Sequence, residues 1–505
     1  MRTLRKIAAA IACLLCTAVQ ARDTATQKLL SAYAGKEPLR SGIVGMLAVR
    51  GNDTLACLNP RVKLVPASNV KVITTGLALQ KLGAGWRFRT TIAYDGHIRD
   101  SVLRGDLYIV GGGDPTTGSG RDCADPAEAT FGAWKSLLDY AGIKRIEGRV
   151  IGDGTLFSRP ATHPAWQTED LGYNYGAGVG GLNFFENAQN FKVMPGAEGE
   201  PPSITQVYPL TPWMSWAVGA VTGPARSPNT LYCINSEFGP WGEFFGSFPS
   251  DRTGGYTFEG SNRFGAYTCA HYFCKFLEFN DIPVSGGWAD VSPRGLVRTD
   301  LLYSDTGTRA VPGDSLTVLG STVSPTLAAI VRDTNRESDN FFAEAILGAL
   351  GLELAASSDA AVAVKAEEGL LRSMGLAPAN ACSLADGSGL SRKNYVSAEF
   401  FVRFLRKMLA GKVRRPFVDS LPVPGARGTL RYRMQGAPDS VKARIRMKSG
   451  SMNGVRSFSG YILPAPGEDD SRTIVFSVIT NNVSGPSATV GNILDDIILS
   501  LAQEP

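Results

Sequence analysis

Three short polar motifs stand in a fixed order along this chain of 505 residues. Ser68 is followed by Lys71 at the expected start of a helix, Ser338 and Asn340 stand at the head of a later helical run, and Lys448 opens Lys-Ser-Gly-Ser in an expected strand. A helix places positions i and i+3 on one face, so the Lys71 amine can reach the Ser68 hydroxyl. Each motif alone is common, and the constraint comes from finding all three in this order.

The Ser68–Lys71 pair also makes chemical sense. A serine hydroxyl is inert as a nucleophile until a base takes its proton. A lysine among other cationic or apolar groups loses its charge more easily than a free lysine. The pair therefore predicts a nucleophilic serine with a lysine beside it.

Hydrophobic periodicity predicts an α+β fold. A strand at 42–50 with a hairpin return at 54–57 opens the chain, and two strands and an apolar helical stripe end it. We expect the first strand to pair with the last two, so that the chain ends meet in one antiparallel sheet flanked by helices. Further expected elements are helices at 68–82, 266–280, 324–350, 359–374 and 397–410, strands within 87–115 and at 445–451, 458–463 and 473–480, a tight turn at 111–115, and irregular β structure over 150–265.

The N-terminus reads as a secretory signal peptide. Arg2, Arg5 and Lys6 precede an apolar run at 7–16, and small residues lead to Ala21, where we expect cleavage. The run is too short to span a membrane, and a lipoprotein signal fits less well. Because three of the positive charges behind the net charge of +5 lie here, a nucleic-acid partner is not expected. We predict an exported protein of the periplasm or cell envelope, with no transmembrane helix in the mature chain.

Cysteine and histidine spacing gives no sign of a metal or redox centre. Beyond the signal, no CxxC pair has a second pair nearby, and no HExxH occurs. His97, His163 and His271 are isolated from one another, which disfavours a Ser-His-Asp triad. One or two disulfides are permitted, with the pairing left open, among Cys57, Cys123, Cys233, Cys269, Cys274 and Cys382.

The three motifs resemble the signature of penicillin-binding proteins and serine β-lactamases. Within that class the chain resembles the class C low-molecular-mass penicillin-binding proteins, the D-alanyl-D-alanine carboxypeptidase/endopeptidases of peptidase family S13. Ser449 stands where that family usually has threonine, which also offers a hydroxyl. The resembling segments are 66–71, 105–116, 142–148, 337–340, 386–391, 421–425 and 428–430.

The resemblance implies an acyl-serine mechanism. Ser68 would attack the penultimate D-alanine carbonyl of a peptidoglycan stem peptide, and Lys71 would take its proton. Ser338 would relay the proton to the leaving amine, Asn340 would hold Lys71 and the substrate, and Lys448 would keep the local potential positive. β-Lactam antibiotics would acylate the same serine, and no cofactor is implied.

The resemblance also implies where substrate binds. The Ser449 and Ser451 hydroxyls, in the strand around Gly450, would hold the terminal carboxylate, and the N–H groups of Ser68 and Ser451 would form an oxyanion hole. Asp153 is a candidate for the side-chain amine of the stem's diamino acid, although an Asp between glycines also suits a turn. No segment supplies the deacylating glutamate of a class A β-lactamase, which favours penicillin binding over penicillin destruction.

The 270 residues from Ser68 to Ser338 exceed what a compact acyl-serine enzyme needs. We therefore expect a signal peptide at 1–21, a discontinuous catalytic domain at 22–89 and 321–505, and a mainly β insertion of one or two domains at 90–320. Two alternatives stay open: a non-catalytic peptidoglycan-binding protein of the same fold, and a secreted SxxK esterase or β-lactamase-like hydrolase.

Overall fold

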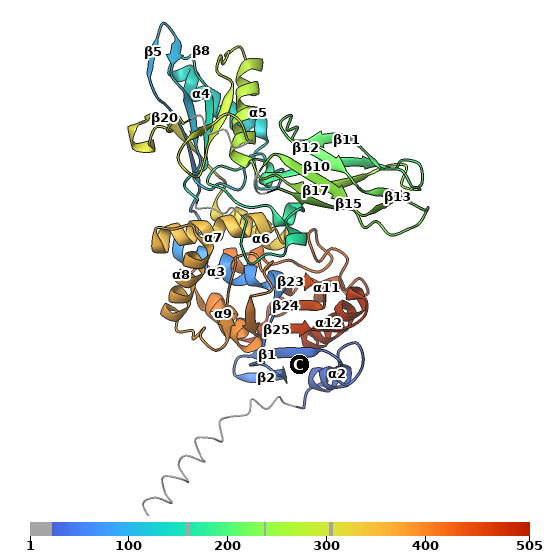
Figure 1. The fold of residues 1–505 in the computed structure, drawn as a ribbon. Coiled ribbons are helices and arrows are strands. Elements are labelled where there is room, and N and C mark those ends of the chain that lie inside the picture. Colours follow the sequence, from blue (N-terminus) through green and yellow to red (C-terminus); the bar gives the residue numbers. More distant parts are fainter. Residues whose placement is uncertain (1–22, 158–161, 237–238, 302–306) are drawn as a thin grey trace, which may run out of the picture. The chain divides into compact units, whose positions relative to one another are not determined.

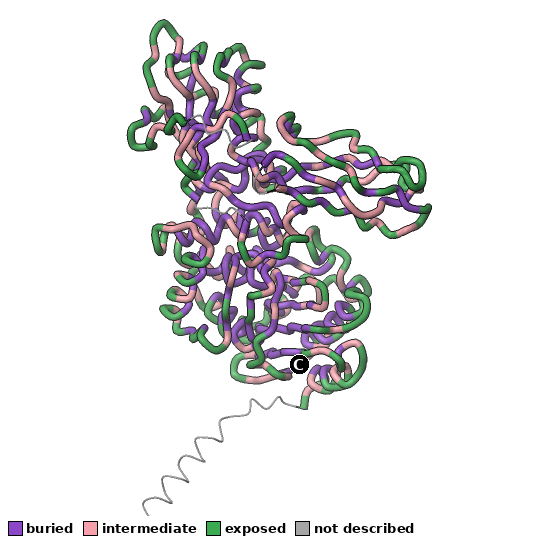
Figure 2. The backbone as a smooth tube through the Cα atoms, viewed as in Figure 1, coloured by how far each residue is buried: buried purple, intermediate pink, exposed green. Residues whose placement is uncertain are grey.

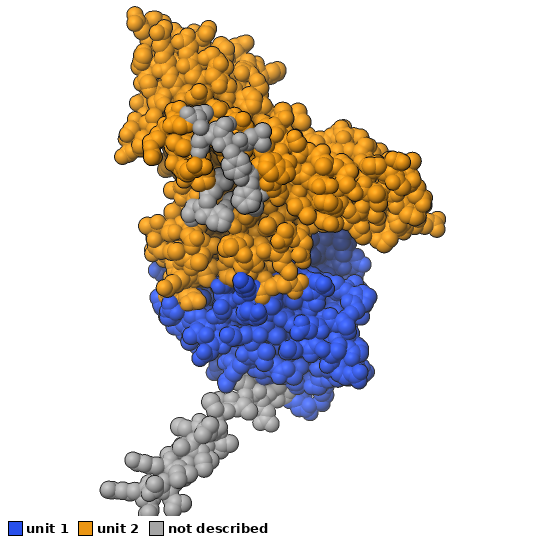
Figure 3. Space-filling model, in the orientation of Figure 1, with its two compact units in different colours: residues 1–72, 371–384, 393–505 blue, residues 73–370, 385–392 orange. Residues whose placement is uncertain are grey.

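The computed structural model describes residues 23–157, 162–236, 239–301 and 307–505, and the predicted signal peptide lies outside them. The chain forms two compact units (Figure 3). Unit 1 comprises the N-terminal part up to residue 72 together with 371–384 and 393–505, and unit 2 comprises 73–370 and 385–392.

Unit 1 is built on an antiparallel five-stranded sheet of order β2-β1-β25-β24-β23 (Figure 1). As expected, the first strand pairs with the last strand, β25, with Ile43 opposite Asn481. The expected pairing with β24 is wrong, because β24 lies between β25 and β23. The predicted α+β sheet therefore forms. Its strands are β1 Ile43–Arg50, β2 Asp53–Leu58, β23 Ile445–Met452, β24 Val455–Ile462 and β25 Ile474–Asn481.

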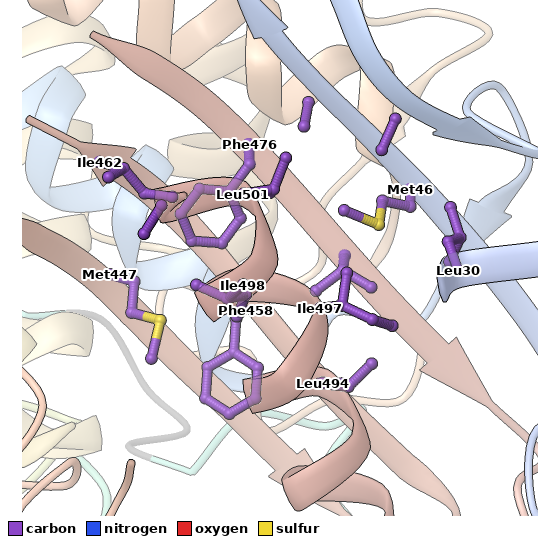
Figure 4. Packing of buried hydrophobic residues seen from close by; sticks show 14 of the residues in the cluster. Leu30, Met46, Met447, Phe458, Ile462, Phe476, Leu494, Ile497, Ile498 and Leu501 are labelled. Carbon is purple, nitrogen blue, oxygen red and sulfur yellow. The ribbon is translucent and has the colours of Figure 1, made fainter. Parts of the chain in front are cut away.

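Helices cover both faces of this sheet. Because strand side chains alternate, one face packs against α2 (Ala25–Ala34) and α12 (Ser487–Ala502), and the other against α9 (Ala398–Ala410). Figure 4 shows Met46 and Phe476 of the sheet in the same cluster as the α12 residues. On the α9 face the Tyr461 hydroxyl donates to the Leu405 carbonyl at 2.8 Å.

Smaller elements complete unit 1. A three-stranded sheet of order β21-β22-β3 lies beside α9, and two short helices precede β23. Their bounds are β3 Lys63–Leu64, β21 Cys382–Ser383, β22 Tyr395–Ser397, α10 Arg414–Ser420 and α11 Asp439–Lys442.

Unit 2 contains the helices that follow the first two motifs. It contains α6 (Leu327–Glu337), α7 (Asn340–Ala355) and most of α3 (Val70–Leu82) and α8 (Ala360–Ser373). The single helical run expected over 324–350 is two helices. The break falls at Ser338, whose φ of 61° is left-handed and ends α6.

The rest of unit 2 is rich in strands. A mixed six-stranded sheet has the order β19-β18-β9-β7-β4-β20, and α4 and α5 pack together in one apolar cluster beside it. Residues 188–261 form small separate sheets, as the β-rich composition predicted. The bounds here are β4 Arg89–Tyr94, β7 Leu107–Val110, α4 Ala127–Tyr140, β9 Val150–Asp153, β10 Ala188–Met194, β11 Ser203–Tyr208, β12 Ser215–Val218, β13 Val221–Gly223, β14 Tyr232–Asn235, β15 Trp241–Phe245, β16 Ser247–Pro249, β17 Tyr256–Ser261, α5 Gly265–Phe279, β18 Trp288–Val291, β19 Val297–Arg298 and β20 Thr317–Val323.

The chain enters and leaves this β-rich part through neighbouring strands, because β4 and β20 pair antiparallel. Burial follows the sheets and helices, while turns and strand ends are exposed (Figure 2). In the described ranges no single helix has the length and hydropathy to cross a membrane. The pair α7 and α8, bent by 69°, meets that test jointly on length and composition alone.

Candidate active site

The first motif sits on a tight turn that leads into α3. Ala67–Asn69 is one turn of 3₁₀ helix, so Ser68 precedes the α-helix instead of lying within it. Ala67 has a left-handed φ of 49°, an unusual conformation for a residue with a side chain. Ser68 is half-buried and Lys71 is fully buried, and the Lys71 Nζ donates to Ser68 Oγ at 3.1 Å. The expected serine–lysine contact is therefore present.

The third motif lies against this turn, because β23 runs alongside it. The approach is close enough to require glycine at 450. A Cβ there would overlap the Pro66 carbonyl oxygen and the Ser457 hydroxyl, and would come within 3.1 Å of the Ser68 nitrogen. The missing side chain thus sets the distance between the nucleophile and the strand.

Lys448 brings a second buried amine to the same unit. Its side chain is fully buried, and its Nζ donates to the Ser449 carbonyl at 2.8 Å. Burial, and secondly the positive charge of Lys71, hold the pKa of Lys448 well below its usual value. Repulsion between the two lysines therefore favours loss of a proton from Lys448.

The two hydroxyls expected to bind carboxylate lie further along β23. The Ser449 Oγ donates to Thr429 Oγ1 at 3.2 Å, and Ser451 is exposed. Thr429 belongs to the Gly428-Thr-Leu430 segment noted in the sequence. Both hydroxyls thus belong to the same unit as the nucleophile.

The second motif lies in unit 2, at the break between α6 and α7. Asp339 caps α7 by accepting a hydrogen bond from the Phe342 nitrogen at 2.9 Å. The Asn340 amide donates to the Tyr175 carbonyl at 2.9 Å. Since Ser338 is left-handed and Asp339 fixes the helix start, the geometry of the loop is set locally.

An arginine from the β-rich part holds this loop. Arg121 lies 2.6 Å from the Asp339 carboxylate and 2.8 Å from that of Glu186. Burial, and secondly the charge of Asp339, raise the pKa of Glu186 well above its usual value, although Arg121 opposes the shift. Neither Arg121 nor Glu186 was predicted as a site residue. A lone Arg and a lone Glu 65 residues apart carry no pattern that would point to the motif.

Asp153 ends β9, and its Oδ1 accepts hydrogen bonds from the nitrogen and hydroxyl of Thr155 at 2.9 and 2.6 Å. Asp153 therefore acts as a turn residue, which is the alternative that its position between two glycines suggested. Its part in recognising the stem's diamino acid stays a prediction.

Other polar groups are placed away from these motifs. His271 is packed among aromatic rings, and burial lowers its pKa to about 4. None of the six described cysteines forms a disulfide. Across the described ranges, no group of three or more His, Cys, Asp or Glu side chains could hold a metal ion.

The structure thus brings Ser68, Lys71 and the Lys448–Ser451 segment together in unit 1, and it holds Ser338 and Asn340 in a fixed loop of unit 2. Assembly of both halves around one serine stays a prediction. Ser457 also contacts the nucleophile turn, Pro66–Asn69, through the Pro66 carbonyl and the Asn69 side chain. Of these two side chains only Asn69 had a sequence signal, its position inside the first motif.

Solved structures share this fold. Penicillin-binding protein 4 (DacB) from Haemophilus influenzae superposes with a TM-score of 0.75 at 20% sequence identity, covering 94% of this chain and 98% of that one. The same protein complexed with a β-lactam superposes with a TM-score of 0.69. These matches confirm the predicted penicillin-binding-protein-like fold.

Sequence comparison agrees. The D-alanyl-D-alanine carboxypeptidase of Actinomadura sp. (strain R39) is 28% identical over 504 residues, which is 97% of this chain and 86% of that protein. A sequence model described as the D-Ala-D-Ala carboxypeptidase 3 (S13) family matches residues 26–240 and 303–500, more than half of the chain, and all three motifs lie inside the match. The predicted class of enzyme is confirmed, and the chain belongs to the D-Ala-D-Ala carboxypeptidase 3 (S13) family of serine peptidases.

Proposed function

We propose that this enzyme acts as a D-Ala-D-Ala carboxypeptidase and endopeptidase on peptidoglycan stem peptides, with Ser68 as its nucleophile. The observation that carries the proposal is the 3.1 Å contact between Lys71 Nζ and Ser68 Oγ, beside a second buried lysine whose pKa is lowered. A serine with an adjacent amine base is the arrangement that forms acyl-enzymes.

Acylation begins when the Ser68 oxygen attacks the carbonyl of the penultimate D-alanine. Lys71 takes the hydroxyl proton, and the N–H groups of Ser68 and Ser451 stabilise the oxyanion. When the tetrahedral intermediate collapses, the C–N bond breaks, and Ser338 relays the proton held by Lys71 to the leaving amine. Asn340 holds Lys71 and the substrate amide, while Ser449 and Ser451 bind the terminal carboxylate. Support comes from the buried lysine pair and the exposed Ser451.

In deacylation, water attacks the Ser68 ester. This releases the shortened stem and regenerates the free enzyme. If the leaving amine belongs to a cross-linked stem instead of free D-alanine, the same steps open the cross-link. A strained β-lactam amide would acylate Ser68 in the same way. The H. influenzae relative whose structure holds a β-lactam supports this extension.

The predicted domain plan fits the strand pairing. We propose that residues 90–320 are an insertion into a catalytic domain formed by 22–89 and 321–505. The antiparallel pairing of β4 with β20 brings the two ends of that segment side by side. The basic and apolar N-terminus further supports export to the periplasm or cell envelope, where peptidoglycan lies.

The first experiment tests Ser68. The mature protein is incubated with a fluorescent penicillin, and D-alanine release from a pentapeptide stem is assayed in parallel. We expect stable covalent label and D-alanine release for the wild type, and neither for Ser68→Ala. Ser471→Ala, an exposed serine of the same unit, is the matched control and should keep both activities.

Each contrary result has a distinct meaning. An unlabelled wild type excludes the acyl-serine mechanism, and label that survives Ser68→Ala moves the nucleophile elsewhere. Label without D-alanine release or cross-link opening points to a binding protein of the same fold. Rapid loss of label with hydrolysed penicillin points to a β-lactamase-like hydrolase.

A further inference from the structure

A chain of two buried hydrogen bonds ties the nucleophile turn to the central sheet. The Ser457 hydroxyl of β24 donates to the Pro66 carbonyl at 2.7 Å, and the Asn69 amide donates to Ser457 Oγ at 2.6 Å. Ser457 and Asn69 are both fully buried. The two residues bracket Ser68, since one bond reaches the residue before Ala67 and the other comes from the residue after Ser68.

The direction of each bond is fixed by chemistry. The Pro66 carbonyl can only accept, so it takes the single proton of the Ser457 hydroxyl. Asn69 must then offer its NH₂ group to Ser457, which leaves its Oδ1 pointing elsewhere. That oxygen is buried and has no hydrogen-bond partner among the described residues. An unpaired buried acceptor is destabilising, so its presence here calls for a structural reason.

Gly450 leaves room for the Ser457 hydroxyl to reach the turn. Gly450 of β23 is paired directly with Ser457 of β24, and a Cβ at 450 would overlap both the Ser457 hydroxyl and the Pro66 carbonyl. The serine side chain therefore reaches the turn through the space that the glycine leaves. Glycine is therefore needed after Lys448 and Ser449 because a side chain would not fit there, and not because of its backbone freedom.

The turn needs such support because of its own conformation. Ala67 has a left-handed φ of 49°, which costs free energy for any residue with a side chain. The Ser68 nitrogen lies between this residue and Asn69, and it is one of the two proposed oxyanion donors. Hydrogen-bond geometry at such a donor controls rate steeply, since loss of one donor lowers turnover about 100–1,000-fold.

We propose that Ser457 and Asn69 are positioning residues that hold the Pro66–Asn69 turn so that the Ser68 N–H points into the oxyanion hole. This inference rests on the proposed function of Ser68. It assigns to β24, which carries none of the three motifs, a part in stabilising the transition state.

The test compares a matched pair of acyl donors that differ only in the reacting carbonyl, one an ester with C=O and one a thionoester with C=S. Sulfur is larger and accepts hydrogen bonds poorly, so an intact oxyanion hole favours the oxygen substrate. We expect Ser457→Ala to lower kcat/KM for the oxygen ester about 30-fold, a part of the effect of losing a donor. The oxygen-to-sulfur preference is the ratio of kcat/KM for the ester to kcat/KM for the thionoester. We expect it to fall at least about tenfold, because the oxyanion hole stabilises the thionoester less.

Thr480→Val is the matched control. Thr480 is a buried residue of β25 whose hydroxyl donates to the Arg456 carbonyl at 3.0 Å, so it loses a similar bond in the same sheet without touching the turn. This variant should keep the wild-type preference for oxygen. If the substitutions only loosened the sheet, kcat/KM would fall equally for both substrates in both variants. That result would overturn the proposal.

A second variant covers the case in which Ser457→Ala fails to fold, as judged by thermal unfolding. Asn69→Ala should lower the oxygen-to-sulfur preference about threefold, because Ser457 keeps its own bond to Pro66. In the double variant the Asn69 change should add little, since both act through one chain of bonds. Full additivity, or an unchanged preference in both single variants, would overturn the inference. If the wild-type protein takes no label, or if label survives Ser68→Ala, the proposed function fails, and this is established before the Ser457 and Asn69 variants are compared.

Discussion

Gly450 is the residue at which the sequence and the geometry of the site meet most directly. We predict that Gly450→Ala lowers the rate of acylation by a fluorescent penicillin at least about 100-fold, because the added Cβ pushes β23 away from the Ser68 nitrogen. Gly436→Ala is the control, since nothing lies within 4 Å of a Cβ there. Near-normal acylation of Gly450→Ala would show that the turn and strand can separate without loss of the hole.

Arg121 gives a second prediction, in unit 2. Its guanidinium lies between the carboxylates of Asp339 and Glu186, whose side chains are only 2% and 14% exposed. Arg121→Gln leaves two neighbouring acids without a cation, which typically costs about 3–5 kcal/mol. We expect a lower melting temperature and slower acylation, because Asp339 caps the helix that carries Asn340.

The control for Arg121 is Arg99→Gln, which changes an exposed arginine of the same unit. Adding Asp339→Asn to Arg121→Gln should recover part of the lost stability, because it removes one uncompensated charge while an amide oxygen can still cap α7. An Arg121→Gln protein with unchanged melting and unchanged acylation would contradict the role of this cluster.

How far single residues could be predicted depends on whether they stand in a pattern. Ser68, Lys71 and Lys448 stand in ordered motifs, so the sequence alone indicates them. Ser457 is one serine in a strand of mixed composition, and its role arises only because β24 lies next to β23. Such roles depend on a pairing register that a single sequence does not encode locally.

The helix α12 shows how well helical periodicity predicts packing. Its apolar positions form one stripe, and Leu494, Ile497, Ile498 and Leu501 are fully buried in the core of unit 1. We predict that Ile497→Ala lowers the free energy of unfolding by about 2–5 kcal/mol, whereas Ile493→Ala, half-buried on the same helix, costs clearly less. Denaturant titration of both variants measures the difference, and equal losses would contradict the assigned face.

The break between α6 and α7 is a feature that helical periodicity does not predict. The residues over 324–350 are strong helix formers, and nothing in their periodicity reveals that Ser338 turns left-handed. Likewise, the order β19-β18-β9-β7-β4-β20 joins strands that are far apart in the chain, and two of its neighbouring pairs run parallel. Local sequence predicts that strands exist there, but the pairing follows from packing among distant segments.

At the scale of the whole molecule, buried carboxyl groups should make the free energy of unfolding depend on pH. Burial, and secondly the charge of Glu344, raise the pKa of Glu367 to about 8; burial and the charge of Asp386 raise that of Glu344 to about 7. Both raised values mean that the folded state binds more protons than the unfolded state between about pH 4.5 and 8. This contribution to stability is present at low pH and is lost as the pH rises through the folded-state pKa values.

We predict that Glu367→Gln reduces this loss by a few kcal/mol, because the amide stays neutral. The free energy of unfolding is measured for both proteins at about pH 5, 7 and 9. The lowered pKa of Lys448 acts in the opposite direction and is common to both, so it cancels in the comparison. If the two proteins lose stability in parallel from pH 5 to 9, Glu367 is not protonated in the folded state at neutral pH.

The pairing of β1 with β25 also has a consequence for how an active molecule comes into being. Val65, just before the nucleophile turn, donates its N–H to the side chain of Asn481, 416 residues later. Ser457, which binds the Pro66 carbonyl, likewise comes from the last tenth of the chain. During biosynthesis the nucleophile therefore emerges before the two strands that support it, β24 and β25. A nascent chain that has not yet added these strands would carry the serine in an inactive form, so their synthesis and docking act as the step that activates the enzyme.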